Sequence, residues 1–159
     1  MKYFLIIGNL NAVTYADVMP SIKRGEVWLG DGKNLDFILP DGGVEKFGNI
    51  RWFTNIGVNN KKPFELTAKY SPEVYKKFDN YDAINVGRVK NIPLDFDGVM
   101  GVPVTFLDKH CPEQFEIIDA REVGLNERQR NKNTYLIKDV DGTINGKPTY
   151  VRICIKKMR

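Results

Sequence analysis

Hydrophobic residues at the start of the chain form an unbroken run rather than an alternating pattern. Residues 3–7 read Tyr-Phe-Leu-Ile-Ile, and the run stops at Gly8 and Asn9. A short continuous apolar run bounded by turn residues is typical of a strand that is covered on both faces in a parallel sheet. We therefore expect the chain to begin in the interior of an α/β fold.

Helix signals follow this predicted strand. Thr14 can cap a helix, and Asp17 lies three residues further on, as in a capping box. Pro20 removes a hydrogen bond when it lies inside a helix, so it predicts a kink or two short turns. Lys23 ahead of Gly25 predicts the end of the helix, because positive charge and glycine both favour that end.

Shorter segments predict the remaining strands. Three lie at residues 26–29, 35–39 and 50–55, separated by Asp-Gly and Gly-Gly turns. A closing hairpin is predicted further on, where residues 135–137 and 150–155 flank a turn-rich segment.

Residues 79–107 follow neither the hydrophobic period of a helix nor that of a strand throughout. Residues 79–86 mix amides and carboxylates with apolar side chains, which favours a turn-rich segment held by side-chain to backbone hydrogen bonds. Residues 102–107 alternate Val, Val and Phe with Pro and Thr, which predicts a half-buried strand. Asp95 and Asp97 lie on opposite sides of an extended chain, so we interpret them as turn formers rather than as an acid and base pair.

Composition indicates one compact domain or a piece of a larger protein. The chain has 159 residues, of which 42% are hydrophobic and 28% are charged. No apolar run approaches the roughly 20 residues that span a bilayer, so we expect a cytoplasmic protein with no membrane partner. Cys111 and Cys154 are far apart and predict reduced thiols. His110 beside Cys111 falls short of the ligand count for zinc, so we expect no metal.

Charge is unevenly distributed along the chain. The net charge is +4, and residues 121–159 hold ten Lys or Arg against four Asp or Glu, a net of +6, which leaves −2 for residues 1–120. A basic C-terminal region can supply phosphate contacts to nucleic acid, and on charge alone a solvated face explains it equally well.

Basic and aromatic residues are interleaved in residues 58–78. The cations can touch phosphates and the rings can stack on unpaired bases. For the rings we favour the alternative that they pin a loop to the domain, whereas for the lysines we favour contact with nucleic acid. The residues are Lys61, Lys62, Phe64, Lys69, Tyr70, Tyr75, Lys76, Lys77 and Phe78.

Two longer blocks carry a specific resemblance. Residues 78–86 read FDNYDAINV and residues 97–107 read DGVMGVPVTFL, and in this order they resemble the C-terminal half of the EcoRI-type adenine-specific DNA methyltransferases. The segments FLIIGNLNA, VWLG and RWFTN, at residues 4–12, 27–30 and 51–55, extend the resemblance over nearly the whole chain.

The resemblance implies an α/β fold in two parts. Residues 1–57 would be the C-terminal part of a Rossmann-like S-adenosylmethionine-dependent methyltransferase sheet, in which the last strand inserts antiparallel. Residues 58–159 would be an irregular α+β DNA-recognition region with the closing strands.

The resemblance also indicates which parts are missing. Related enzymes use a glycine-rich turn for S-adenosylmethionine and an Asn-Pro-Pro-Phe-like tetrapeptide for catalysis, and neither occurs in this sequence. We therefore assign no catalytic residue. We expect S-adenosylmethionine to serve the intact enzyme and not to be bound by this chain alone.

Target-base contacts are expected from the end of the first strand and from residues 51–55. Asn9 and Asn11 follow the strand where sheets of this class present ligand contacts, although closing a turn explains them equally well. In related adenine methyltransferases an aromatic ring stacks on a base taken out of the duplex, and the resemblance places Trp52 or Phe53 at the position of that ring. Because strand side chains alternate, only one of these two rings can serve.

Duplex contacts are expected from cations that hold phosphates and from asparagines that read adenine. For the asparagines, ordering their own loop is the favoured alternative. The residues are Lys76, Lys77, Asn80, Asn85, Arg88, Lys90, Arg121, Arg128 and Arg130.

The sequence thus leads to one main functional hypothesis. The chain would be a C-terminal fragment of an adenine-specific N6 DNA methyltransferase of a restriction-modification system, with double-stranded DNA and a complementing N-terminal methyltransferase chain as partners. The alternatives are a stand-alone DNA-binding module and an inactive remnant.

Overall fold

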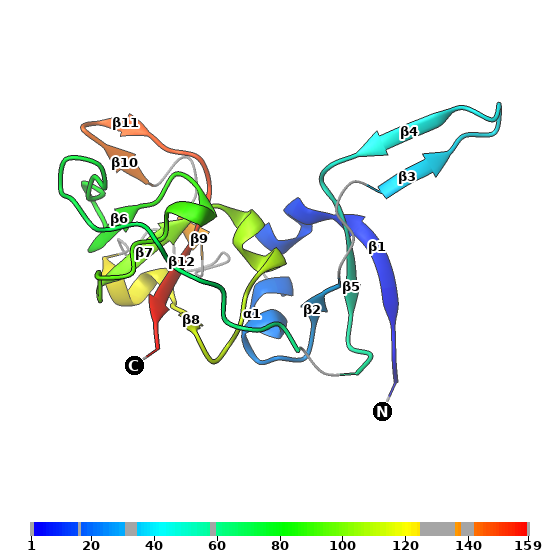
Figure 1. Ribbon diagram of the computed structural model, residues 1–159, viewed down its shortest axis with the longest axis horizontal. Coiled ribbons are helices and arrows are strands. Elements are labelled where there is room, and N and C mark those ends of the chain that lie inside the picture. The colour runs from blue at the N-terminus through cyan, green and yellow to red at the C-terminus, as the bar shows by residue number, and fades with distance from the viewer. Residues whose placement is uncertain are drawn as a thin grey trace. The chain divides into compact units, whose positions relative to one another are not determined.

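A computed structural model describes residues 2–15, 17–30, 35–57, 60–124, 136–137 and 142–158. The chain forms two compact units, Met1–Asn59 and Asn60–Arg159 (Figure 1), and each is described by itself. The roles that the sequence assigns to the two parts of the chain stay predictions.

The first unit is built on a three-stranded sheet in the order β1-β5-β2, in which β5 is antiparallel to both neighbours (Figure 1). This arrangement is compatible with the antiparallel last strand expected from the resemblance, and the wider Rossmann-like sheet stays a prediction. Buried Leu10, Val13, Met19, Ile22 and Leu29 form the interior of this unit. Its elements are β1 (Leu5–Asn9), the 3-10 helix η1 (Leu10–Thr14), α1 (Val18–Lys23), β2 (Trp28–Leu29), β3 (Leu35–Ile38), β4 (Val44–Phe47) and β5 (Ile50–Thr54).

The first strand differs from the expectation of a strand covered on both faces. Among the described strands only β5 pairs with β1, and the exposed fractions of Leu5, Ile6 and Ile7 are 53%, 56% and 42%. The prediction of a buried parallel strand is wrong for this chain, because its second edge has no strand beside it in the described structure. An apolar run predicts a strand, but it does not say which neighbours are present.

The helical segment forms two short helices, but the break lies between Thr14 and Val18, ahead of Pro20 and not at it. Residues 10–14 form η1, and α1 begins at Val18, so Pro20 is its third residue and lies in the first turn, where N–H groups have no partner within the helix. The capping box did not form: the Thr14 hydroxyl donates to the carbonyl of Asn11 inside η1 instead. Gly25 ends the helix at φ 69°, as expected.

The hairpin β3–β4 projects from the three-stranded sheet of this unit (Figure 1). β4 was missed in the sequence because Val-Glu-Lys-Phe is too short and mixed to stand out. The turn is closed by Asp41, whose carboxylate accepts from the Gly43 N–H, and Gly42 there has φ 84°.

The second unit is built on a five-stranded sheet in the order β6-β7-β12-β8, with β9 also paired to β12. Only β6 and β7 are parallel. The pairing of β9 with β12 confirms the predicted closing hairpin strands for the residues described. The elements are β6 (Ala83–Asn85), η2 (Val89–Asn91), β7 (Val99–Val102), η3 (Val104–Asp108), β8 (Phe115–Ile117), η4 (Ala120–Val123), β9 (Leu136–Ile137), β10 (Thr143–Ile144), β11 (Lys147–Pro148) and β12 (Arg152–Lys157).

The strand predicted at residues 102–107 is wrong. β7 ends at Val102, and the chain then turns into η3, for which Pro103 is the N-cap residue. The buried rings of Phe106 and Phe115 meet edge to face at 5.4 Å between centroids, so this apolar segment packs as a helical turn rather than as a strand.

Both faces of the second sheet are partly covered. Met100, Ile153 and Ile155 share one face and are fully buried. The other face carries Gly101 and Cys154, and it packs against a second buried cluster of Phe78, Tyr81, Ala83, Ile118, Ala120 and Ile137.

Phe78 and Gly101 join the two sequence blocks that carried the resemblance. A Cβ on Gly101 would lie 2.9 Å from Phe78 Cε2 and 3.2 Å from Arg152 Cβ. The absence of a side chain at Gly101 therefore makes the space in which the Phe78 ring lies on the sheet.

Candidate nucleic-acid interface

Exposed cations are concentrated on the residues around β6. The side chains of Lys76, Lys77, Arg88 and Lys90 are exposed. The Lys76 carbonyl accepts from the Asn85 N–H at 2.8 Å, so the segment that carries the two lysines runs beside β6. Lys76 and Lys77 thus lie beside β6, and Arg88 and Lys90 follow the end of the same strand along the chain.

The two predicted asparagines are used inside the fold. The Asn80 side-chain oxygen accepts from the Thr143 N–H at 3.4 Å. The Asn85 side-chain oxygen accepts from Arg152 Nε at 2.9 Å, and burial lowers the pKa of this guanidinium. These contacts favour the alternative that the asparagines order the protein, although the partners lie far along the chain and not in the same loop.

Asp79 anchors the same segment more strongly. Its carboxylate accepts from the N–H groups of Asn145 and Gly146 at 3.0 and 2.8 Å, in the turn between β10 and β11. The Gly146 N–H is the main cause that lowers the pKa of Asp79, and the Asn145 N–H adds to it. The predicted side-chain to backbone hydrogen bonds of residues 79–86 are therefore confirmed.

The remaining predicted cations are only partly covered by the structure. Arg121 lies in η4, but its side chain is outside the described residues, as are Arg128 and Arg130 altogether. In the basic C-terminal strand, Lys157 pairs with Asp97 at 3.3 Å and donates to the Leu94 carbonyl.

Most aromatic residues of the 58–78 segment pack, as favoured from the sequence. Tyr75 and Phe78 are buried, and the Phe64 ring lies 5.7 Å from that of Phe115. Lys61 has a structural contact, because its Nζ donates to the Leu107 carbonyl at 3.0 Å. The contact of the lysines with nucleic acid stays a prediction.

In the first unit, the predicted target-base residues differ in how accessible their side chains are. The Asn9 side chain caps η1 by accepting from the Asn11 N–H at 2.8 Å, which is the turn-closing alternative, whereas the Asn11 side chain is exposed. Phe53 is only 7% exposed and packs on the sheet, while Trp52 is half-buried. Of the two rings, Trp52 is the accessible one, and its contact with a base stays a prediction.

His110 is an interior residue. Its Nε2 lies 3.1 Å from the Phe115 carbonyl, and burial lowers its pKa. Within the described ranges, no group of three His, Cys, Asp or Glu side chains is arranged to hold a metal.

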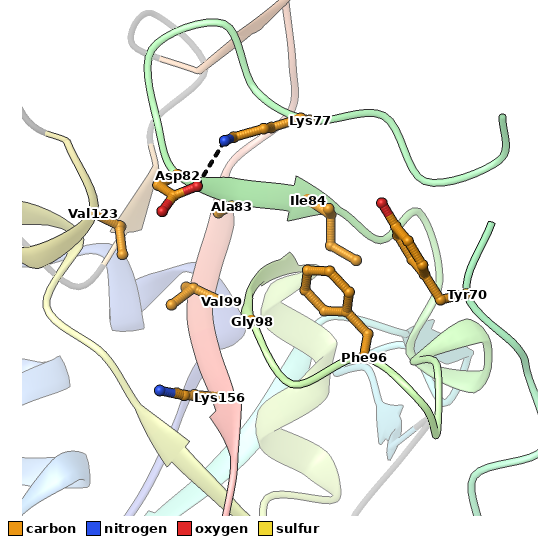
Figure 2. Close-up of a pocket in the computed structure, with 10 residues that line it drawn as sticks. All are labelled: Tyr70, Lys77, Asp82, Ala83, Ile84, Phe96, Gly98, Val99, Val123 and Lys156. Atoms are coloured by element: carbon orange, nitrogen blue, oxygen red, sulfur yellow. Dashed lines mark ion pairs between the residues drawn. The ribbon is translucent and has the colours of Figure 1, made fainter. Parts of the chain in front are cut away.

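A pocket of about 410 Å³ opens on the second sheet beside β6 (Figure 2). Tyr70 and Phe96 form one part of its wall, and Lys77, Asp82 and Lys156 supply charge at its margins. Sequence reasoning treated Tyr70 as a packing residue and did not single out Phe96 or Lys156. The only signal for Phe96 was an aromatic ring between two turn-forming aspartates.

None of the described helices combines the length and hydropathy needed to cross a bilayer.

Comparisons with known proteins agree with one another. The family model described as "Adenine-specific methyltransferase EcoRI" matches residues 1–158. The type II methyltransferase M.EcoRI of Escherichia coli is 42% identical over 180 aligned positions, which cover 99% of this chain and 51% of that protein.

Two mycoplasma proteins are also similar. M.MgeORF184P of Mycoplasma genitalium and M.MpnI of Mycoplasma pneumoniae, both type II methyltransferases by name, are each 34% identical, and the matches cover 58% and 57% of their lengths. The chain thus spans little more than half the length of these curated relatives. No solved structure matches it significantly. Because the family model covers all but one residue, this chain belongs to the EcoRI-type adenine-specific methyltransferase family.

Proposed function

We propose that this chain is the C-terminal part of an adenine-specific N6 DNA methyltransferase of a restriction-modification system, and that it holds the duplex and the target base. The match of the family model over residues 1–158 carries this proposal. The share of about half of each relative's length supports the view that further parts of the enzyme lie elsewhere.

Duplex binding rests on the exposed cations Lys76, Lys77, Arg88 and Lys90. Cationic side chains hold phosphates and release bound counterions, so the affinity they provide falls as salt rises. Trp52 offers a half-buried ring in the other unit, and a ring is suited to stack on a base that has left the duplex.

The sequence contains no glycine-rich turn of the kind that related enzymes use for S-adenosylmethionine. In the turn after β1, the Asn9 side chain accepts from the Asn11 N–H. The cofactor therefore belongs to the intact enzyme in this proposal, and we derive no step through it.

A partner is suggested by the edge of β1 that none of the described strands covers. Its residues Leu5, Ile6 and Ile7 are apolar and exposed, as expected for a strand that another strand should cover. The proposed partner is a complementing N-terminal methyltransferase chain that supplies this strand with the donor-binding and catalytic parts.

A methylation assay tests this proposal. The chain alone should transfer no labelled methyl group from S-adenosylmethionine to duplex DNA, whereas addition of a polypeptide that matches the first half of M.EcoRI should restore transfer to adenine. Methylation by this chain alone would contradict the division of labour. If the mixture stays inactive, DNA binding decides between a stand-alone binding module and an inactive remnant.

DNA binding is measured by titration of a labelled duplex at two salt concentrations. The double variant R88Q/K90Q should weaken binding and flatten the salt dependence by roughly 0.9 in the log–log slope for each phosphate that the variant no longer neutralises. The matched control is Lys46→Gln, because Lys46 is exposed on β4, in the other unit and outside the four proposed cations. Salt-independent binding, or an equal effect of the control, would refute the phosphate contacts.

A further inference from the structure

The pocket beside β6 lies in the second unit and shares no residue with the predicted target-base set Asn9, Asn11, Trp52 and Phe53. We propose that this pocket binds one unpaired nucleotide of a DNA strand, with the base against Phe96 and the phosphate between Lys77 and Lys156. The inference rests on the proposed function in that it takes DNA as the ligand of this unit.

A row of aromatic rings ends at the pocket. The rings of Tyr75 and Tyr70 stack with centroids 5.9 Å apart, and the ring of Tyr70 lies 4.7 Å from that of Phe96. Tyr75 is buried, whereas Tyr70 and Phe96 are half-buried and line the pocket (Figure 2). A flat heterocycle can extend such a row, because every base has a π-face and stacking needs no particular sequence.

Gly98 fixes the position of the last ring. A Cβ at this residue would lie 2.6 Å from Phe96 Cζ and 2.7 Å from Cε1, closer than real Cβ contacts allow. The Phe96 ring therefore folds back over the backbone of its own loop, and only a glycine leaves room for it. A ring that is held in this way is preorganised for a flat ligand.

The floor of the pocket lies on one face of the second sheet, where β6, β7 and β12 contribute one side chain each. Ala83 on β6 pairs in register with Val99 on β7, and continuing the β7–β12 register sets Lys156 opposite Val99. These three side chains share one face of the sheet, where the buried cluster of Phe78 and Tyr81 ends. The volume of about 410 Å³ falls within the roughly 300–1,000 Å³ of small-molecule sites.

The charge of the lining suits a phosphate. Lys77 and Lys156 contribute +2 and Asp82 contributes −1, which gives a net charge of +1. Lys77 pairs with Asp82 at 2.7 Å, but both side chains are largely exposed, so the pair is weak and a phosphate can compete for the lysine. No ion pair engages Lys156 in the part of the chain that is described. Aromatic rings next to cations are the combination that binds single-stranded nucleic acid.

The experiment compares three labelled duplexes of one sequence, using the full chain and fluorescence anisotropy. One duplex is fully paired, one carries a single bulged adenosine, and one carries an abasic bulge at the same place. The bulged adenosine should bind between about 5-fold and about 150-fold more tightly than the abasic bulge, the range that stacking of one base on an aromatic ring provides. The abasic duplex controls for the greater flexibility of bulged DNA.

Variants locate the effect in the pocket. Phe96→Leu should abolish the preference for the bulged adenosine, and Phe96→Tyr should keep it. Lys156→Gln should weaken binding of the two bulged duplexes more than binding of the fully paired duplex. The matched control is Tyr150→Leu, which also removes a ring but at an exposed residue outside the pocket. Thermal unfolding of each variant separates impaired binding from impaired folding, and if Phe96→Leu does not fold, Gly98→Ala displaces the same ring and should reduce the preference instead.

Equal affinity for the bulged and abasic duplexes would overturn the inference, and so would a preference that survives in Phe96→Leu or disappears in Tyr150→Leu. Free deoxyadenosine monophosphate separates the sources of the ligand: if it competes with the bulged duplex, the pocket accepts the nucleotide itself. Binding of the monophosphate without any binding of paired duplex would keep the pocket and refute the proposed function. Binding of paired duplex without a bulge preference would refute the nucleotide pocket and leave the proposed function standing.

Discussion

Gly101→Ala tests whether the two sequence blocks that carried the resemblance meet as described. The change adds a single methyl group at the centre of the second sheet, on the face where Phe78 lies. The new Cβ would lie 2.9 Å from Phe78 Cε2 and 3.1 Å from Cζ, whereas ordinary contacts begin at 3.4 Å. The ring must therefore move by about 0.5 Å (3.4 minus 2.9), and on the other side the Cβ of Arg152 leaves no slack at 3.2 Å.

The expected loss of stability follows from these distances. Forcing one extra methyl group into a packed core costs about 1–3 kcal/mol. Replacing glycine with alanine in a strand returns about 0.5–1 kcal/mol, because the unfolded chain loses freedom. Gly101→Ala should therefore lower the free energy of unfolding by about 1 kcal/mol, within a range of about 0–2.5 kcal/mol.

Urea denaturation followed by far-ultraviolet circular dichroism and tyrosine fluorescence measures this free energy, because both tryptophans, Trp28 and Trp52, lie in the other unit. Gly87→Ala is the matched control, because a Cβ there meets nothing within 4 Å, and it should leave stability unchanged or slightly raised. Phe78→Leu alone should also destabilise the protein, but the double variant with Gly101→Ala should lose less than the sum of the two single losses, with a coupling of at least about 0.5 kcal/mol. Strict additivity of Gly101→Ala with Phe78→Leu would refute the contact.

Three further predictions concern titratable groups. Burial lowers the pKa of His110, so between its ordinary pKa of 6.5 and the lower native value only the unfolded chain takes up the proton. The stability contributed by neutral His110 should therefore be complete above pH 6.5 and fall below it. A urea midpoint that does not change between pH about 7.5 and about 5, or that changes equally in His110→Gln, would contradict this. Hydrogen bonds from the N–H groups of Gly146 and Asn145 lower the pKa of Asp79, so its contribution to stability is present above the ordinary pKa of 3.8 and is lost as pH falls through the native pKa. Asp79→Asn should therefore reduce the melting temperature at neutral pH, and the difference in melting temperature from the wild type should disappear in acid. Burial raises the pKa of Cys154 to about 12, so a thiol-specific dye at pH about 8 should label it only after denaturation, and rapid labelling of the native chain would show that the site is open.

Local signals in the sequence predicted the elements that depend on local physics. Gly25 ended the first helix and Gly42 and Gly43 formed a turn with Asp41, since each effect is set by the residue itself and its near neighbours. The same reasoning failed for Val104 and Phe106, whose alternation predicts a strand. Those side chains reach the interior through a 3-10 turn after Pro103, and a three-residue alternation does not distinguish the two.

The candidate site was predictable only in part, because contacts between distant residues decide it. The exposed lysines and Arg88 were found from charge alone. The partners of Asn80 and Asn85 lie 63 and 67 residues away, so no local pattern shows that these amides are occupied. The pocket depends on the register of β6 and β7, which places Ala83 beside Val99, and on Gly98, whose role appears only when the Phe96 ring is seen above it.

The edge of β1 has a consequence for how this polypeptide behaves in a test tube. Natural edge strands are usually guarded by charged residues, proline or bulges, and Leu-Ile-Ile-Gly-Asn has none of these. Two copies can add their first strands to one another across a twofold axis, which would make the apparent mass rise with protein concentration. Such self-pairing would compete with any other polypeptide that needs the same edge, so dilution rather than excess of this chain should favour assembly with it.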